Sequence, residues 1–270
     1  MLSDGRGRVL KPMNDALRSA REAAFYARLA ELALPPPAAG LFPRFFGVVA
    51  VPGCGSGGGG GAAAAAQLEH LALEDVTACF RRPSVMDVKV GTRTFGDDAS
   101  EAKAAAEMRK YPLQAEVGLR ITGMRVYEGE SGGERGGGAS GGASGGASGE
   151  YRVLGRAFGL GLRDRAALVS GFSEFLRDAR RGCVRAELVA PLLRRVREIE
   201  AWVEAQREFR FIGSSLLFVY EGSEAQDDEP GIDVRLIDFA HTVLRTGARD
   251  DGVLVGLRSV AEALQSIAAG

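Results

Sequence analysis

The sequence contains little cysteine and no excess of charge of either sign. Its three cysteines, Cys54, Cys79 and Cys183, are odd in number and far apart, without C-x-x-C spacing. This pattern argues against a disulfide framework and a zinc site, and it predicts a reducing compartment. The 34 basic residues are balanced by 35 acidic residues, so no overall field attracts nucleic acid or an anionic membrane surface.

A long apolar stretch is also missing from the N-terminal segment, which carries Asp4, Arg6 and Arg8 instead. The segment therefore predicts neither a signal peptide nor a membrane-spanning helix. We expect a soluble monomer in the cytoplasm, the nucleus or both, without nucleic-acid binding or stable membrane insertion. The length of 270 residues is enough to bury a sizeable core, either in one two-lobed domain or in two small domains.

Lysine is the scarcest of the charged residues. Of the 34 basic side chains, 30 are arginine and only four are lysine, namely Lys11, Lys89, Lys103 and Lys110. In a sequence that favours arginine so strongly, a retained lysine indicates a position that requires a compact ammonium group, the alternative being survival by chance.

Two low-complexity tracts divide the chain, at residues 53–66 and 132–149, and both are rich in Gly, Ala or Ser. They lack the apolar area that would offset the entropy of ordering, so we interpret them as flexible loop insertions. We expect residues 1–76 to form an N-terminal lobe and residues 77–270 a C-terminal lobe.

Apolar periodicity predicts the elements of both lobes. In the small lobe, we expect strands at residues 9–12, 45–51 and 68–76 and a helix at 15–34. In the larger lobe, we expect strands at 84–90, 118–127, 151–158, 214–220 and 234–239, the last two as a hairpin, and helices at 99–110, 163–180, 186–207 and 252–268. This order predicts an α+β fold with a small sheet and helix, a larger mixed lobe and a cleft between them.

Charged residues interrupt two of the apolar strands. The segment 83–91, PSVMDVKVG, places Asp87 and Lys89 two residues apart and so on one face of the strand. Burying both is costly unless they pair with each other or act on a ligand. Asp238 ends the second strand, where a carboxylate suits Mg²⁺ bridging nucleotide phosphates or merely caps a turn. Ser215, at the start of the neighbouring strand, offers a hydroxyl to the same metal or is only a turn residue.

Three motifs in this order resemble the inositol polyphosphate kinase family: P-x-x-x-D-x-K-x-G at residues 83–91, Ser-Ser-Leu-Leu at 214–217 and Ile-Asp-Phe at 237–239. Agreement continues in DAS at 98–100, KYP at 110–112, GMRVY at 123–127 and FVYEG at 218–222. The resemblance covers nearly the whole chain outside the two tracts. It is closest to the multikinase branch, because the substrate-facing segment after Gly91 is one short helix and the chain is near minimal length.

The resemblance implies a two-lobed fold similar to that of protein kinases and SAICAR synthase, with ATP in the cleft. Lys11, with Glu22 as its partner, would contact the ATP phosphates. Adenine would be held by the backbone carbonyl of Glu74 and the backbone amide of Val76, and Asp87 would receive the ribose hydroxyls.

The resemblance also implies how phosphate is transferred. Lys89 would reach the transferring phosphoryl group, and Asp238 with Ser215 would hold Mg²⁺, so that Lys11, Lys89 and Asp238 form the catalytic set. The acceptor inositol phosphate would contact Arg18, Lys89, Lys103, Lys110 and His241. Lys103 and Lys110 lie two helical turns apart on one face of the predicted helix, where they could meet successive phosphates. The alternative is that this face is simply exposed to solvent. This helix carries Ala106 and Glu107 where related multikinases often carry glutamine.

The implied activity is phosphorylation of inositol 1,4,5-trisphosphate at its 6- and 3-hydroxyls, giving the pentakisphosphate. An inositol trisphosphate 3-kinase and an inositol hexakisphosphate kinase would share the same motifs. Phosphatidylinositol 4,5-bisphosphate is a further substrate to consider, and a catalytically inactive binding module is the alternative of another class.

Overall fold

The computed structural model describes residues 2–36, 38–52, 67–130, 149–223 and 231–270. The tract at 53–66 and all but Gly149 of the tract at 132–149 therefore lie outside the described residues. The described elements are β1 (Leu2–Ser3), β2 (Arg8–Pro12), α1 (Ala16–Glu31), η1 (Ala38–Leu41), β3 (Phe45–Pro52), β4 (Gln67–Glu74), β5 (Pro83–Val90), α2 (Glu101–Lys110), α3 (Leu113–Val117), β6 (Leu119–Glu130), β7 (Gly149–Leu154), α4 (Arg156–Gly161), α5 (Arg165–Phe175), η2 (Ala186–Leu188), α6 (Val189–Ala205), β8 (Phe209–Arg210), β9 (Ser215–Glu221), β10 (Ile232–Ile237), β11 (Val243–Leu244) and α7 (Asp251–Ala269).

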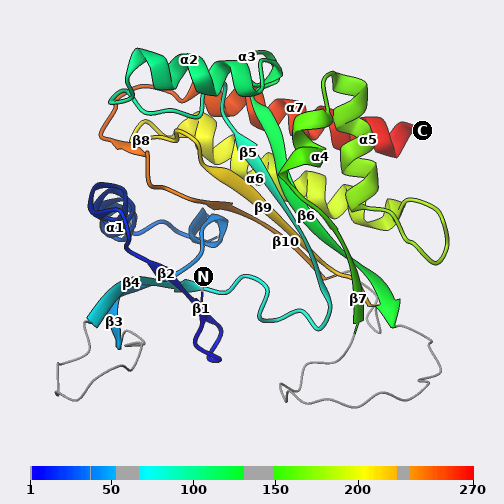
Figure 1. Cartoon of the computed structure of the whole chain (residues 1–270), viewed down its shortest axis with the longest axis horizontal. Helices are drawn as coiled ribbons and strands as arrows, with labels where there is room; N and C mark the ends of the chain where they lie inside the picture. Colours follow the sequence, from blue (N-terminus) through cyan, green and yellow to red (C-terminus); the bar gives the residue numbers. More distant parts are fainter. Residues whose placement is uncertain (1, 37, 53–66, 131–148, 224–230) are drawn as a thin grey trace, which may run out of the picture.

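The smaller lobe is a four-stranded antiparallel sheet with α1 beside it (Figure 1). Its strand order is β1-β2-β4-β3. Helix α1 begins at Ala16 because the Asp15 side chain accepts the Arg18 amide and caps the helix. The expected helix at 15–34 ends early, at Glu31, since Ala33 adopts a left-handed backbone with φ of 45°.

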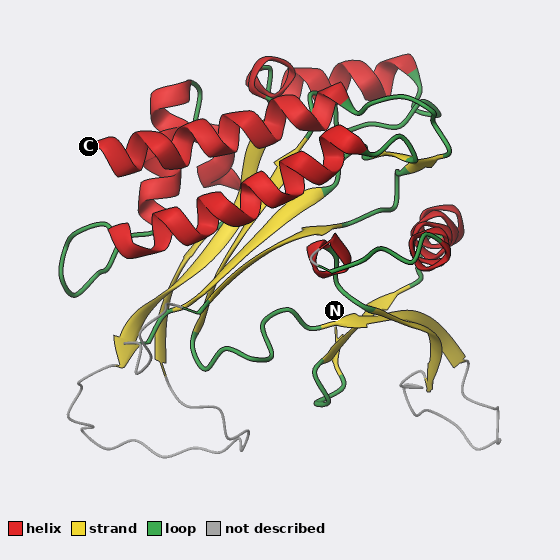
Figure 2. Ribbon diagram, turned by 180° about the vertical axis from the view of Figure 1, so that it is seen from behind, coloured by secondary structure: helices red, strands yellow, loops and turns green. Residues whose placement is uncertain are grey.

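The larger lobe is a five-stranded antiparallel sheet in the order β10-β9-β5-β6-β7, with β5 at its centre. Figure 2 shows its helices covering one face of this sheet, with the smaller sheet and α1 on the other side. The predicted hairpin of β9 and β10 is present, and Ile237 pairs with Ser215. The two-lobed α+β fold is therefore confirmed, whereas the division at residue 76 stays a prediction.

The last helix, α7, approaches the sheet closely through glycine. A Cβ at Gly256 would lie 2.1 Å from the Gly118 carbonyl oxygen, and Gly118 itself has a φ of +65°. Among the described residues, α7 alone is long and apolar enough to cross a membrane, but half of its apolar window is buried. Its buried residues, including Leu254, Leu257 and Val260, belong to the core, which identifies α7 as a core helix of this lobe.

Several expected boundaries in the larger lobe differ from those of the structure. The strand expected at 151–158 ends at Leu154, and a short helix, α4, follows it. The helix expected at 163–180 is only Arg165–Phe175, because the chain turns at Leu176 into a loop in which Arg177 bridges Val184. The helix expected at 99–110 begins at Glu101, and Ser100 caps it by accepting the Lys103 amide.

An aromatic cluster packs the smaller lobe onto the larger one. Phe25 of α1 stacks on Phe239, which follows β10, with ring centroids 3.8 Å apart. Phe42, Phe209 and Phe211 surround this pair at centroid distances of 5.0 to 6.0 Å. Because all five rings are buried, the segment that follows β10 is fixed directly against α1.

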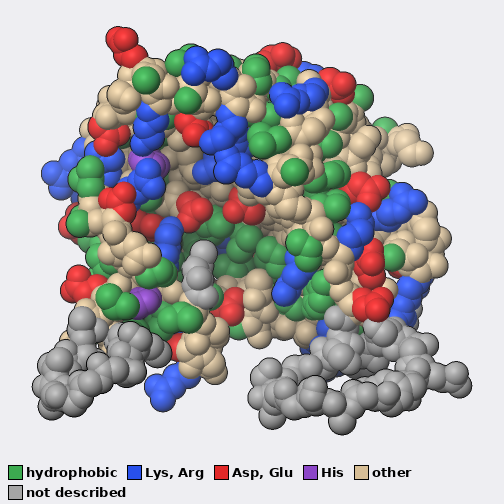
Figure 3. All heavy atoms as spheres, viewed as in Figure 1, with side chains coloured by type: hydrophobic (Ala, Val, Ile, Leu, Met, Phe, Trp, Pro, Cys, Tyr) green, Lys and Arg blue, Asp and Glu red, His purple; other side chains and the backbone are tan. Residues whose placement is uncertain are grey.

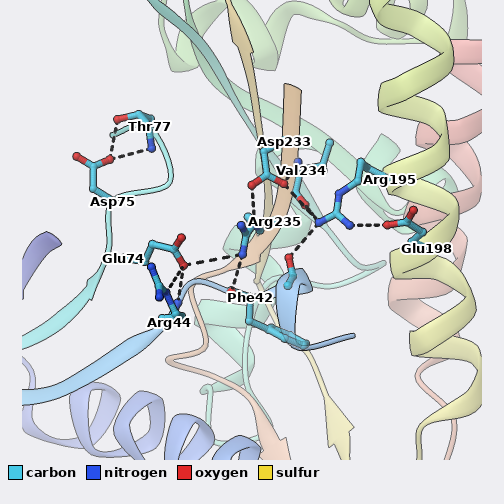
Figure 4. Close-up of polar contacts among 11 residues, drawn as sticks. Phe42, Arg44, Glu74, Asp75, Thr77, Arg195, Glu198, Asp233, Val234 and Arg235 are labelled. Carbon is cyan, nitrogen blue, oxygen red and sulfur yellow. Dashed lines mark hydrogen bonds and ion pairs between the residues drawn. The ribbon is translucent and has the colours of Figure 1, made fainter. Parts of the chain in front are cut away.

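A polar network also joins the lobes (Figure 4). On β10, Asp233 binds Arg235 through Nε at 2.6 Å and contacts Arg195 of α6 at 3.4 Å. Arg235 donates to the Phe42 carbonyl oxygen at 3.0 Å and lies 3.9 Å from the Glu74 carboxylate. We call these four charged residues (Glu74, Arg195, Asp233 and Arg235) the interlobe network. Each of its charges has an opposite charge within reach.

Candidate active site

Strand β5 places Asp87 and Lys89 on the face of the sheet that points away from the helices. Its residues alternate along the strand, with Met86, Val88 and Val90 fully buried and Asp87 and Lys89 half-buried. The alternation on β5 survives a bulge, because the extra residue, Thr122, belongs to β6. Asp87 and Lys89 therefore share a face, as their spacing predicts.

These two charges do not form an ion pair with each other. The Lys89 ammonium instead donates to the Gly213 carbonyl oxygen at 2.5 Å, and the Asp87 Oδ1 atom is buried with no hydrogen-bond partner among the described residues. A same-strand pair is thus not what keeps the two charges in the strand. An orphaned buried carboxylate oxygen is an acceptor site open to a ligand hydroxyl.

Burial dominates the electrostatics of both residues. It raises the pKa of Asp87, a rise that the hydroxyls of Thr122 and Ser215 partly oppose. Burial lowers the pKa of Lys89, against the opposing charges of Asp238 and Asp87. Each charge is therefore less stable here than in water, a pattern found more often at functional sites than at structural ones.

An ion pair connects the lobes at Lys11 of β2. Its ammonium lies 2.7 Å from Asp238 Oδ1 and 2.8 Å from Glu22 Oε2, so the predicted partnership with Glu22 is present. Burial opposes the charge of Lys11, but Asp238 and Glu22 outweigh it and raise the pKa of the lysine. Burial also raises the pKa of Glu22. The lysine is held charged at the point where β2 meets the end of β10.

Asp238 leaves β10 through a strained backbone. Its φ is +63°, a left-handed conformation that few residues other than Gly, Asn and Asp adopt. The Ser214 hydroxyl donates to the Asp238 carbonyl oxygen at 2.9 Å, and the neighbouring Ser215 is buried and pairs with both Lys89 and Ile237. This turn fixes the Asp238 carboxylate close to Lys11.

The donor set suits a metal only when a ligand supplies further oxygens. Within the described ranges, no group of three or more His, Cys, Asp or Glu side chains is placed to hold a metal ion. Asp238 alone, with the hydroxyl of Ser215, resembles the sparse protein ligation that Mg²⁺ has when phosphates and water complete its shell. The carboxylate and the unpartnered Asp87 oxygen thus fit a metal nucleotide better than a free ion.

A second group of charges surrounds His241. Burial is the main cause that lowers its pKa, and the cations Arg18, Arg21 and Lys103 add to it, whereas Asp98 opposes it. The imidazole Nδ1 is buried without a partner among the described residues. Arg18, Lys103 and His241, three of the five residues predicted for the acceptor, are therefore electrostatically coupled. The sequence prediction missed Arg21, which pairs with Asp98 at 3.0 Å.

The two lysines of α2 differ in their surroundings. The exposed Lys103 has no hydrogen-bond or ion-pair partner for its ammonium among the described residues, whereas Lys110 lies 2.6 Å from the Glu107 carboxylate. The Lys110 hydrogen bond is the main cause that lowers the pKa of Glu107. Glu107 therefore offsets part of the positive charge on this face of α2.

A further buried cation, Arg120, was also missed from the sequence. It lies opposite Lys89 on β6, so both side chains occupy one face of the sheet, and it is stacked 5.8 Å from the ring of Tyr111. Burial lowers its pKa. The signal was present, because Arg120 interrupts an apolar strand just as Asp87 and Lys89 do.

The predicted hinge for adenine lies at the end of β4. The Glu74 side chain is turned toward Arg44 and Arg235, as Figure 4 shows, which leaves its backbone as the part available to a base. Val76 is nearly fully buried, and its amide donates to no other described residue. The roles of both residues stay predictions.

Figure 3 shows these charges in context, since acidic and basic side chains gather around a hollow between the lobes. Asp87, Lys89 and Asp238 interact electrostatically with one another, Asp238 contacts Lys11, and a second group of cations surrounds His241. Such an arrangement can hold a metal-bound phosphate chain and a second anion side by side.

Comparison with known proteins identifies the family. The family model described as inositol polyphosphate kinase matches residues 70–265. The chain belongs to the inositol polyphosphate kinase family. The match includes all three motifs that carried the resemblance, and it begins in β4, so β2 with Lys11 lies outside it.

Curated relatives of two kinds are about equally similar. Rat inositol polyphosphate multikinase is 33% identical over 222 residues, covering 80% of this chain and 48% of that protein. Mouse inositol hexakisphosphate kinase 3 is 32% identical over 226 residues, covering 74% of this chain and 51% of that protein. The chain spans about half the length of these relatives.

Solved structures agree on the fold. Inositol phosphate multikinase Ipk2 from S. cerevisiae, in complex with ADP and Mn²⁺, superposes with a TM-score of 0.68 at 20% identity, covering 96% of this chain and 98% of that chain. A second inositol phosphate multikinase structure gives 0.66 at 25% identity, covering 91% and 99%.

Proposed function

We propose that this chain is an ATP-dependent inositol polyphosphate multikinase that phosphorylates inositol 1,4,5-trisphosphate at the 6- and 3-hydroxyls. Family membership and the relatives described above support transfer of phosphate to an inositol phosphate. The observation that carries the proposal is the contact of Lys11 with Asp238 at 2.7 Å, beside the unpaired charges of Asp87 and Lys89. These four residues come from both lobes and lie close enough to interact electrostatically.

The nucleotide would occupy the side of the hollow next to β4. Glu74 and Val76 offer backbone groups to adenine, and the unpartnered Asp87 oxygen suits a ribose hydroxyl. Lys11 is held charged, as a contact to phosphate requires. Asp238, with Ser215, would hold Mg²⁺, for which the Mn²⁺ in the yeast multikinase structure is a precedent. When bound, the metal neutralises charge on the transferring phosphate.

The acceptor would lie toward α2, where Arg18, Lys103 and His241 are coupled. Lys89 stands between the two sides, and binding of two anions would restore the charge that burial now disfavours. Phosphoryl transfer needs in-line positioning and charge neutralisation more than covalent chemistry by the protein. Lys89, placed between the nucleotide and the acceptor, would help to position both anions and to neutralise their charge.

Glu107 favours the multikinase over an inositol hexakisphosphate kinase. Its carboxylate takes up the charge of Lys110 and would repel an extra phosphate at this point of the acceptor. A less phosphorylated inositol can present a hydroxyl there instead. The similar identities of the two kinds of relatives give no preference, so this local charge is the feature that separates them.

The test is incubation of the protein with ATP, Mg²⁺ and a panel of inositol phosphates, with products separated by chromatography. We expect inositol 1,4,5-trisphosphate to yield tetrakis- and then pentakisphosphate. Pyrophosphate products from inositol hexakisphosphate as the main activity would contradict the multikinase assignment. Absence of ATP consumption with every acceptor would contradict kinase activity itself and favour a binding module.

Vesicles containing phosphatidylinositol 4,5-bisphosphate belong in the same panel, because that lipid presents the same phosphorylated ring. We propose it as a second acceptor of the same site. Labelled phosphate in the extracted lipid is the readout, with phosphatidylinositol vesicles as the control.

A further inference from the structure

A second basic cavity lies at the opposite end of the five-stranded sheet. It has a volume of ≈ 330 Å³ and is lined by the end of β6, the end of β9 and the loop that joins α5 to η2. Four arginines line it: Arg177, Arg180, Arg181 and Arg185. Figure 1 shows the α5 to α6 connection far from α1 and α2, which border the candidate active site.

Distance separates this cavity from the kinase site. Tyr220 lines the cavity near one end of β9, whereas Ser215, at the other end of the same strand, pairs with Lys89 of the candidate active site. Five residue steps along β9 separate these two positions, which amounts to about 17 Å at 3.4 Å per step. A small ligand in one site therefore does not reach the other.

Positive charge exceeds negative charge in the cavity. Of its two described acidic residues, Glu128 is engaged outside the cavity, whereas the Asp178 carboxylate lies 3.8 Å from the Arg181 Nε atom and offsets part of that charge. Glu128 pairs with Arg152 at 2.8 Å. Asp178 Oδ1 accepts the amides of Arg180 and Arg181 at 2.9 and 3.0 Å, and these backbone contacts lower its pKa against the effect of burial. Asp178 thus shapes the loop that presents the arginines rather than neutralising their guanidinium groups fully.

Two of the arginines are presented in different ways. Arg185 is held at the wall, with its side chain only 14% exposed, by the Glu187 carboxylate at 3.0 Å, the Glu221 carbonyl oxygen at 3.0 Å and the Tyr220 ring at 5.2 Å. The Arg180 guanidinium lies against the backbone of Gly129, where a Cβ would be only 2.5 Å from its Nε. Among the described residues, none accepts a hydrogen bond from Arg180.

We propose that this cavity binds a small anion that carries two or more phosphate groups. Arginine forks match phosphate oxygens in bidentate geometry, so the unpaired Arg180 suits such a ligand, and the fixed Arg185 adds a further positive charge to the same cavity. The volume lies within the range of small-molecule sites. The ligand class includes soluble inositol polyphosphates and the headgroup of a phosphorylated inositol lipid, and the inference does not depend on the kinase reaction.

Calorimetric titration with inositol hexakisphosphate at fixed salt tests the proposal. We expect two sites on the wild-type protein. In the double variant R177Q/R180Q, the affinity of one of these two sites for inositol hexakisphosphate should fall at least about tenfold, which corresponds to 1.4 kcal/mol. Lys103→Gln should weaken the other site instead. The double variant R165Q/R194Q removes the same charge from exposed positions on α5 and α6 and should retain both sites.

Three outcomes would overturn the proposal. The first is unchanged binding in R177Q/R180Q, and the second is an equal loss in R165Q/R194Q, which would indicate general electrostatics. The third is a second site that is absent from the wild type and appears only in the double variant D227N/D228N. That result would mean that the acidic sequence after Ser223, and not a phosphate ligand, occupies the cavity of the wild-type protein. Thermal unfolding of each variant checks that it is folded.

Vesicle flotation then distinguishes the source of the phosphates. Vesicles with phosphatidylinositol 4,5-bisphosphate should bind wild-type protein but not R177Q/R180Q if the ligand is a lipid headgroup. Soluble binding without flotation assigns the cavity to a free inositol polyphosphate. Failure of both assays contradicts the anion site, whatever the kinase activity proves to be.

Discussion

The two groups of charges that connect the lobes are built on opposite principles, although both include residues of the β10 segment. In the interlobe network, Asp233 and Arg235 pair with each other at 2.6 Å and with groups of α6 and the smaller lobe. At the end of the same strand, Asp238 faces Lys11, while the nearby Asp87 and Lys89 carry charges that burial disfavours. Every charge of the network is paired, whereas the site combines the Lys11–Asp238 ion pair with two charges, Asp87 and Lys89, that have no ion-pair partner among the described residues.

This comparison predicts that substitutions in the two groups have effects of different kinds. Changes in the network should reduce stability and leave the chemistry of folded molecules intact. Changes at the site should abolish chemistry and leave stability intact or even increased. The expected effects below run from the largest to the smallest.

The largest effect is expected for Lys89→Ala and Asp238→Asn. Each should reduce turnover with inositol 1,4,5-trisphosphate by at least about 10³-fold, because preorganised charge at the phosphoryl group is lost. The midpoint of denaturation should stay near that of the wild type. Initial rates and circular dichroism measure the two quantities, and wild-type activity in either variant contradicts the assignment.

Asp233→Ala should have the opposite signature. It leaves Arg195 and Arg235 without their shared carboxylate, and since all three side chains are 16 or 17% exposed, we expect a loss of about 2–3 kcal/mol in the free energy of unfolding. Urea denaturation measures this loss. Glu116→Ala removes a carboxylate that is 66% exposed and serves as the matched control, with little expected change.

Asp87→Asn should stabilise the protein by about 0.5–1 kcal/mol at neutral pH while impairing nucleotide binding. Burial raises the pKa of Asp87, so the folded state holds its proton more tightly than the unfolded state does. The wild type therefore loses stability as pH rises through the folded pKa, and the asparagine variant does not. The advantage of the variant should vanish below about pH 4. Lower stability of the variant at neutral pH would contradict this account.

The smallest effect is expected for Glu107→Gln. It frees Lys110 from its 2.6 Å partner and should lower the KM for inositol trisphosphate about two- to fivefold, a change of the size of a surface ion pair. Glu101→Gln, on the exposed first turn of α2, is the control. An increased KM in the Glu107 variant would mean that its carboxylate binds the acceptor directly.

Much of the fold could be predicted from the sequence, because its signals are local. Alternation along β5 placed Asp87 and Lys89 on one face, and the structure agrees. The failure at α4 also has a local cause, since Gly159 and Gly161 are poor helix formers and hide its periodicity. Tertiary packing decided that segment, because a Cβ at Gly159 would lie 1.8 Å from the Ile121 carbonyl oxygen.

The proximity of the candidate site residues could be predicted from the sequence, but their individual contacts could not. Resemblance supplied Lys11, Lys89 and Asp238, and the Lys11 ammonium does meet Asp238. The pairing of Lys110 with Glu107 and the position of Arg120 depend on side-chain geometry and on register across the sheet. Such contacts depend on how the elements pack in three dimensions, and local sequence patterns do not reveal them.

The left-handed backbone of Asp238 bears on how copies of such a chain lose their reaction during evolution. Asparagine and glycine adopt this conformation readily, whereas β-branched residues do not. By the metal-binding role proposed above for Asp238, a gene copy that exchanges this aspartate for asparagine would encode a well-folded but inactive protein. Expression and solubility are therefore no guide to whether such a copy still transfers phosphate.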